Sequence, residues 1–169
     1  KIIFKRMEIE KNILRESSIL KSIRHSSVLK FLGVHTNSNE IKIFTEYLPN
    51  SSLKNKLHSV KKDEKWTTTK KYITLIGISD AMRYLHEHNI IHRDLKPENV
   101  MIDSNYYPRL CDFGLSRFLP DELTDSGKAY LTVDIGPPCY MAPEMIDDGS
   151  NEYDRTVDVY AFGIMANEI

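Results

Sequence analysis

The stretch His92-Arg93-Asp94-Leu95-Lys96-Pro97-Glu98-Asn99 says more about the fold than any other part of this 169-residue chain. Two further motifs follow it in order, Asp112-Phe113-Gly114 and Ala142-Pro143-Glu144. Five fixed positions in the first stretch, each at a background frequency of roughly 5%, would arise by chance about once in several million windows. A fortuitous polar loop therefore does not explain these motifs.

The three motifs, in this order, resemble the catalytic domain of eukaryotic protein kinases, and the resemblance covers essentially the whole chain. It implies an α+β fold of the bilobal protein-kinase type. We expect residues 1–48 to form part of a small β-rich lobe with one regulatory helix. Residues 49–169 would form part of a mainly helical large lobe, with the catalytic loop, the activation segment and the start of the central helix.

Phosphoryl transfer needs alignment and charge neutralisation more than covalent help, and the resemblance assigns these tasks to four residues. Asp94 is expected to be the catalytic base that accepts the proton of the substrate hydroxyl. Asn99 and Asp112 carry hard oxygen ligands suited to Mg²⁺ that bridges the phosphates of ATP. Lys96 resembles the lysine that serine/threonine kinases place on the transferred phosphate, so the resemblance favours Ser/Thr specificity.

The resemblance also implies a nucleotide site built largely from the first half of the chain. Glu16 is expected to pair with the lysine that anchors ATP. Lys1 is favoured as that lysine, with Lys5 as the alternative that lies closer to the predicted helix. Thr45-Glu46-Tyr47-Leu48 resembles the gatekeeper and hinge, whose backbone binds adenine. The residues expected to contact the nucleotide are Lys1, Glu16, Thr45, Glu46, Leu48, Met101 and Asp112.

Alignment with the family stacks four side chains into a spine, which is equally well described as core packing. These are Leu20, Phe31, His92 and Phe113, and Asp158 is expected to anchor them through the backbone of residues 92–93. We expect Cys111 to behave as a small buried hydrophobe.

The family's serine/threonine members usually carry a threonine where this chain has Pro137. Proline supplies neither a hydroxyl nor an N–H. We therefore expect Asp94 and Lys96 to be less well oriented, which lowers efficiency without changing the mechanism.

The loop between Asp112 and Glu144 offers phosphorylation sites to an upstream kinase. Thr132 lies nearest the usual position, and Arg93 supplies a guanidinium that would pair with the phosphate. The other candidates are Ser116, Thr124, Ser126 and Tyr130.

The composition is that of an ordinary globular domain, with 41% hydrophobic and 28% charged residues and a formal net charge of −1. Scattered basic residues argue against a nucleic-acid surface. Apolar runs are too short to span a bilayer. Cys111 and Cys139 form no disulfide framework, which favours a reducing compartment and a cytoplasmic location.

Hydrophobic periodicity and turn residues predict the secondary structure. The long helix before the catalytic stretch should bury a stripe of Leu75, Ile78, Met82 and Leu85. The expected helices cover 6–23, 53–58, a segment capped by Thr67 or Thr68 and running to about Glu87, and a segment from about Thr156. The expected strands cover 28–34 and 40–47, with shorter ones within 90–103 and 107–112.

Residues 158–164 and Trp66 are similar to the tyrosine-kinase-like group of serine/threonine kinases. Two other functions stay open: a pseudokinase or scaffold module, and a small-molecule kinase of related fold. The Gly-rich loop that covers the ATP phosphates should precede Lys1, and the arginine that pairs with Glu144 should follow Ile169. We therefore expect these 169 residues alone to be poorly stable, to bind nucleotide weakly and to be nearly inactive.

Overall fold

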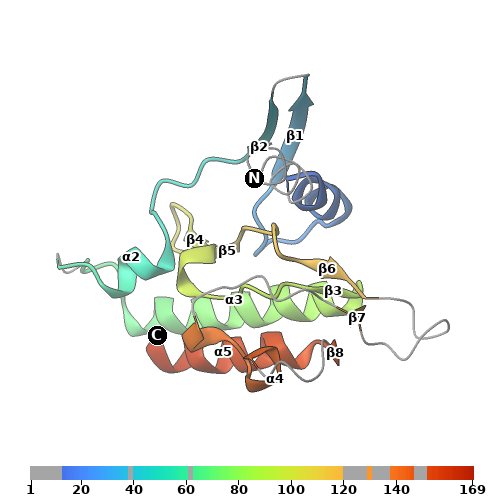
Figure 1. Cartoon of the computed structure of the whole chain (residues 1–169). Helices are drawn as coiled ribbons and strands as arrows, with labels where there is room; N and C mark the ends of the chain where they lie inside the picture. The colour runs from blue at the N-terminus through green and yellow to red at the C-terminus, as the bar shows by residue number, and fades with distance from the viewer. Residues whose placement is uncertain (1–12, 38–39, 61–62, 120–128, 131–137, 147–151) are drawn as a thin grey trace.

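A computed structural model describes residues 13–37, 40–60, 63–119, 129–130, 138–146 and 152–169. The upper part of the molecule in Figure 1 contains a helix over residues 13–22 and the strands β1 (Phe31–Thr36) and β2 (Ile41–Thr45). The lower part contains two long helices, α3 (Thr68–Glu87) and α5 (Thr156–Glu168), which lie side by side. This mixture of a small sheet and larger helices confirms the expected α+β fold class.

Short elements connect these parts and carry most of the candidate site. The helical ones are α2 (Leu53–Leu57), the 3₁₀ turns η1 (Pro97–Asn99) and η2 (Pro138–Tyr140), and α4 (Pro143–Ile146). The short strands are β3 (Ile90–Ile91), β4 (Val100–Ile102), β5 (Pro108–Leu110), β6 (Arg117–Phe118), β7 (Ala129–Tyr130) and β8 (Glu152–Tyr153).

Within the described residues, the strands form four antiparallel pairs: β1–β2, β3–β6, β4–β5 and β7–β8. The prediction that the first strand begins at Val28 is wrong, because β1 begins at Phe31. Val28 instead forms a bridge with Leu110 of β5, and the N–H of Leu29 donates to the Leu110 carbonyl at 2.9 Å. The backbone that was expected to extend the hairpin thus joins it to the lower part.

Helix α3 follows the sequence prediction closely. The Thr67 side chain accepts a hydrogen bond from the N–H of Lys70, as an N-cap should, and the helix ends at Glu87. Ile78, Met82 and Leu85 are buried as predicted, whereas Leu75 is half-buried and Thr74 is buried in its place. Gly77 permits close packing against β5, since a Cβ at that position would lie 2.5 Å from Pro108 Cγ.

One hydrophobic core runs through both parts. It contains Ile19 and Leu20 from the first helix together with Ile78 and Leu85 of α3 and Leu110 of β5. The core is therefore continuous across residue 48, and the division into lobes 1–48 and 49–169 stays a prediction. None of the helices in the described part of the chain is both long and apolar enough to cross a membrane.

Candidate active site

Asp94 is held by two side chains from its own loop. Lys96 Nζ donates to Asp94 Oδ1 at 2.8 Å and to Oδ2 at 2.6 Å. Asn99 Nδ2 donates to Asp94 Oδ2 and to the Asp94 carbonyl oxygen, both at 2.8 Å. The side chains of Asp94 and Lys96 are 9% and 15% exposed. The carboxylate is therefore fixed in orientation but still reachable from solvent.

A single 3₁₀ turn brings Asn99 back to Asp94. Pro97 occupies the first position of η1, where its fixed φ suits a helical turn and its missing N–H is not needed. The N–H of Asn99 donates to the Lys96 carbonyl at 3.0 Å and closes the turn. The sequence Lys-Pro-Glu-Asn thus encodes the local geometry of the site.

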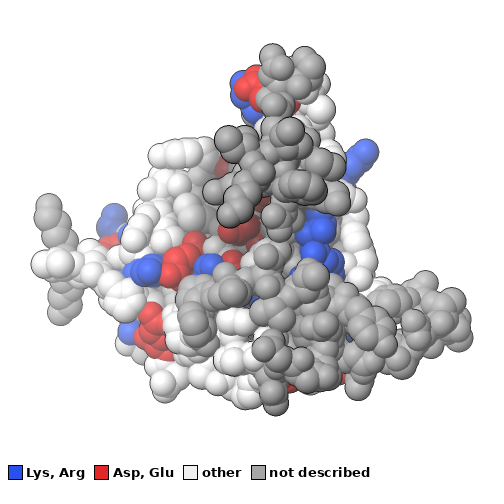
Figure 2. Space-filling model, viewed as in Figure 1, with Lys and Arg blue, Asp and Glu red and all other residues white. Residues whose placement is uncertain are grey.

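Asp112 reaches the same place from strand β5. The N–H and the thiol of Cys111 both donate to the Asn99 carbonyl oxygen, at 2.9 and 3.2 Å. Asp112 itself is exposed and has a φ of 62°, in the left-handed region that non-glycine residues seldom adopt. The structure therefore brings Asp94, Asn99 and Asp112 together. Figure 2 shows acidic side chains in the middle of this face, below the β1–β2 sheet and above α5.

The backbone before Asp94 is braced from helix α5. The Asp158 carboxylate is 1% exposed and accepts the N–H groups of His92 and Arg93, each at 2.8 Å. It also contacts His86 Nε2 at 2.9 Å. Arg93 has a φ of 70°, so this brace holds a strained conformation immediately before Asp94. The expected contact between Asp158 and residues 92–93 is confirmed.

His92 links the brace to the Asp112 segment. Its Nδ1 accepts the N–H of Asp94 at 3.3 Å, which leaves Nε2 to carry the proton and donate to the Cys111 carbonyl at 3.2 Å. The rings of His92 and Phe113 lie 5.1 Å apart between centroids, and both residues are fully buried. Phe113 and Leu20 belong to the core against which Phe31 packs, as the expected spine requires.

Glu16 faces the same segment from the first helix. Partial burial raises the pKa of Glu16, the nearby Asp112 carboxylate raises it further, and a hydrogen bond from the Phe113 backbone lowers it. A cation beside Glu16 would favour its ionised form. Lys1 and Lys5, the two lysines considered for this task, lie outside the described residues.

The residues expected to contact adenine lie where the upper part joins the lower part. Thr45 ends β2, Met101 lies in the middle of β4, and both are half-buried, as is Leu48. The backbones of Glu46 and Lys30 are joined by a 3.0 Å hydrogen bond from the Glu46 N–H to the Lys30 carbonyl. Their contact with a nucleotide stays a prediction.

Two expectations are corrected by the structure. Ser116 cannot serve as a surface phosphorylation site in this conformation, because it is fully buried and its hydroxyl donates to the His92 carbonyl at 3.1 Å. Cys111 is half-buried and hydrogen-bonded rather than an apolar filler. Sequence reasoning missed both supporting roles, although each residue lies next to or near Asp112-Phe113-Gly114. Pro137, Thr124, Ser126 and Thr132 lie outside the described residues.

The oxygen atoms of the site suit Mg²⁺. Asn99 uses its Nδ2 on Asp94, so Oδ1 remains as an acceptor, and the exposed Asp112 follows Cys111, which contacts the Asn99 carbonyl. Magnesium typically takes one or two protein oxygens and fills its other positions with water and substrate phosphates. Within the described residues, no three His, Cys, Asp or Glu side chains form a closed metal site. An amide and one carboxylate fit an ion shared with a phosphate ligand.

Comparisons with known proteins agree with this geometry. The family model for the protein kinase domain matches residues 1–169. A probable serine/threonine-protein kinase of Dictyostelium discoideum is 38% identical over 174 residues, covering 100% of this chain and 16% of the relative. The serine/threonine-protein kinase CTR1 of Arabidopsis thaliana is 37% identical over 159 residues, covering 92% of this chain and 18% of the relative.

A third relative, the serine/threonine-protein kinase STY46 of Arabidopsis thaliana, is 35% identical over 162 residues. That match covers 96% of this chain and 26% of the relative. The chain thus spans only about a sixth to a quarter of the length of these three proteins.

Proposed function

Because this chain belongs to the protein kinase domain family, we propose that the protein transfers the γ-phosphoryl group of ATP to a serine or threonine hydroxyl of a protein substrate. One observation carries the proposal: Asn99 links the two motifs. Its side-chain amide donates to the Asp94 carboxylate, and its backbone carbonyl accepts the N–H of Cys111, the residue before Asp112. This arrangement supports a shared site for the proposed proton acceptor, Asp94, and the two proposed oxygen ligands, Asn99 and Asp112. The names of the three relatives support serine or threonine as the acceptor.

In this proposal Asp94 orients the substrate hydroxyl and accepts its proton. The hydroxyl oxygen forms a bond to the γ-phosphorus while the bond from that phosphorus to the bridging oxygen breaks, and ADP leaves. Lys96 lies 2.6 Å from Asp94 Oδ2 and supplies a positive charge beside the transferred group. Mg²⁺, when bound, would be held by Asn99 Oδ1 and Asp112 and would neutralise phosphate charge.

The remaining assignments place ATP between the two parts of the molecule. Lys1 would pair with Glu16 and anchor the phosphates. The backbone around Glu46 and the side chains of Thr45, Leu48 and Met101 would hold adenine. The half-buried position of Glu16 next to Asp112 supports its assignment, because a lysine there would be favoured by two carboxylates.

An Asp94→Asn variant of the full-length protein tests the proposal. We expect kcat for peptide phosphorylation to fall by about 10²- to 10⁴-fold, because the variant loses the base, while the thermal shift caused by Mg·ATP is retained. Glu64→Gln removes an equal charge at an exposed position and should leave kcat unchanged. Nucleotide binding without Asp94-dependent transfer would instead identify a pseudokinase. Transfer to small molecules but not to a peptide array would exclude a protein substrate.

We further infer that an upstream kinase phosphorylates Thr132. Arg93 supports this proposal because it adjoins Asp94 and its Nη1 donates to the Leu115 carbonyl at 3.1 Å, so its guanidinium lies near the start of the same segment. Phosphopeptide mapping of active protein should find phosphate on Thr132. Phosphate confined to other residues would exclude this site.

A further inference from the structure

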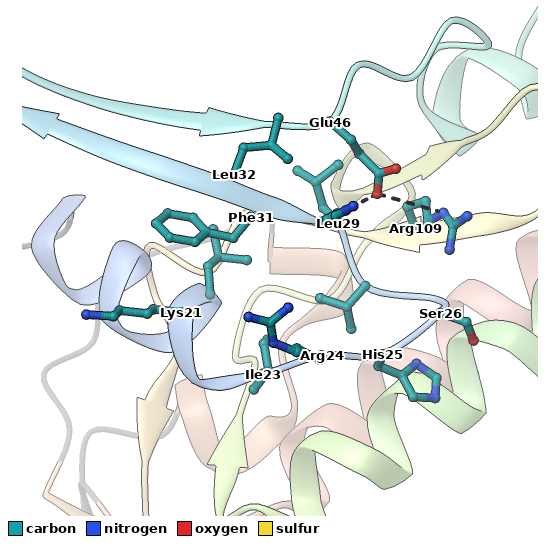
Figure 3. A pocket seen from close by; sticks show the side chains of 13 residues that line it. Lys21, Ile23, Arg24, His25, Ser26, Leu29, Phe31, Leu32, Glu46 and Arg109 are labelled. Atoms are coloured by element: carbon teal, nitrogen blue, oxygen red, sulfur yellow. Dashed lines mark hydrogen bonds and ion pairs between the residues drawn. The ribbon is translucent and has the colours of Figure 1, made fainter.

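A cavity of about 530 Å³ lies where the first helix, strand β1 and Arg109 of β5 meet (Figure 3). Its lining includes none of Asp94, Lys96, Asn99 or Asp112, so it is separate from the residues proposed to carry out phosphoryl transfer. It does include Glu46, whose backbone is proposed to hold adenine. The volume is within the range of small-molecule sites in proteins.

The walls of the cavity provide an apolar surface on two sides. Leu20, Ile23 and Val28 form buried walls at the helix end and the following loop. Phe31 and Leu32 come from β1, and Leu32 is 60% exposed (Figure 3). Covering this leucine with an apolar ligand would remove hydrocarbon surface from water, which favours binding.

The same lining is rich in basic side chains and contains one acid. The basic residues are Lys21, Arg24, His25, Lys30 and Arg109, and the acid is Glu46. Glu46 is already engaged: its Oε1 accepts the N–H of Lys30 at 2.8 Å and lies 4.0 Å from Arg109 Nε. His25 is engaged as well, because its Nε2 contacts Asp80 Oδ2 at 3.0 Å.

Arg24 differs from Glu46 and His25. Its backbone N–H donates to the Tyr84 hydroxyl at 3.1 Å, but its guanidinium has no hydrogen bond or ion pair with any described residue. Figure 3 shows that side chain rising from the helix end into the space toward β1. An exposed guanidinium beside an apolar wall is suited to a ligand that carries both an anion and a hydrophobic body.

We propose that this cavity binds a small amphipathic organic anion, a carboxylate or sulfonate carried on an aromatic or branched aliphatic body. Arg24 receives the anionic group, and Phe31 and Leu32 cover the body. Lys21 and Lys30 add positive potential around the entrance. A neutral ligand of the same shape gains the apolar contacts but leaves the Arg24 guanidinium unpaired.

Isothermal titration calorimetry of the full-length protein with biphenyl-4-carboxylate tests this site, with neutral biphenyl-4-carboxamide as the matched probe. We expect saturable binding of the carboxylate and about fivefold weaker binding of the carboxamide. Arg24→Gln should weaken carboxylate binding by about fivefold and Leu32→Ser by about threefold. Lys65→Gln, which removes an exposed charge elsewhere, should have no effect. A saturating non-hydrolysable ATP analogue should not displace the probe.

Equal affinity for the two probes, displacement by the ATP analogue, or unchanged binding in Arg24→Gln would overturn the proposal. So would a failure of the carboxylate to bind while an acidic peptide binds, or a dimerisation that Arg24→Gln abolishes. Those last outcomes would assign this face to a protein partner or to a second copy of the chain. Asp94→Asn should leave probe binding intact, so failure here is separable from failure of the proposed kinase activity.

Discussion

Residues 92–99 and the β1–β2 sheet lie in one molecule but meet solvent very differently. In the first region His92, Leu95 and Asn99 are at most 5% exposed, and the backbone is tied to Asp158 of another element. In the second, Leu32, Val34 and Phe44 are 60%, 47% and 51% exposed. Large apolar side chains of the β1–β2 sheet thus face solvent, whereas the apolar side chains of residues 92–99 are buried.

The difference shows which features of this fold fix the orientation of the site side chains. Asp94 and Asn99 are positioned because the backbone around them is buried, strained at Arg93 and fixed by a buried carboxylate. Within the part of the chain that the structure describes, β1 and β2 pair only with each other and have one covered face, so this sheet contributes surface more than alignment.

Two phenylalanines give the largest test of this comparison. Phe113→Ala should lower the free energy of unfolding by about 3–5 kcal/mol, because a fully buried ring leaves a cavity against His92. Phe44→Ala should change it by less than about 1 kcal/mol, because half of that ring is already in water. Urea denaturation of both variants measures the difference. Equal losses would show that the sheet is buried by contacts outside the described residues.

The hydrogen bonds between Asp158 of α5 and the backbone of residues 92–93 should give the second-largest effect on stability. Asp158→Asn replaces one carboxylate oxygen by an N–H₂ donor that cannot accept from His92 or Arg93, so we expect a loss of about 2–4 kcal/mol. Glu87→Gln, in an exposed pair with Arg83, should lose less than about 0.5 kcal/mol. The same urea titration compares them. If Asp158→Asn lowered the free energy of unfolding as little as Glu87→Gln does, the hydrogen bonds of Asp158 would not be what fixes the backbone before Asp94.

Sequence patterns predicted those parts of the structure in which local signals and packing agree. Helix α3 has an N-cap at Thr67, an apolar stripe, and polar residues at its C-terminal end, so both of its ends were predictable. The start of β1 was not, because the Leu29 N–H donates to the Leu110 carbonyl and the Leu110 N–H donates to the Ser27 carbonyl, about eighty residues away in the chain. Local periodicity carries no information about such a partner.

The candidate site shows the same division. Motif spacing singled out Asp94, Asn99 and Asp112, which the fold brings together, and alignment with the family also identified Asp158. The burial of Ser116 and the paired hydrogen bonds of Cys111 were not predictable, because they depend on where the Asp112 segment crosses the loop. A residue type alone does not reveal whether its polar atom will find a buried partner.

The two cysteines offer the smallest and most local test of the contrast between buried and exposed regions. Burial, with smaller contributions from the charges of Asp112 and Glu16, raises the pKa of the Cys111 thiol to about 12. At pH 8 its thiolate is therefore about two-thousandfold scarcer than that of a thiol with the ordinary pKa of about 8.5. A more basic thiolate is more nucleophilic, which recovers about fortyfold, so alkylation should be about fiftyfold slower than at an ordinary thiol.

Iodoacetamide labelling followed by mass spectrometry should therefore modify the exposed Cys139 first. The rate at Cys111 should rise about tenfold per pH unit between pH 8 and pH 10, because the folded-state pKa lies above that window. Binding of Mg·ATP next to Asp112 should slow Cys111 further and leave Cys139 unchanged. Comparable rates for the two cysteines at pH 8 would mean that the Asn99–Cys111 contact opens readily, and that the site is less firmly positioned than its hydrogen bonds indicate.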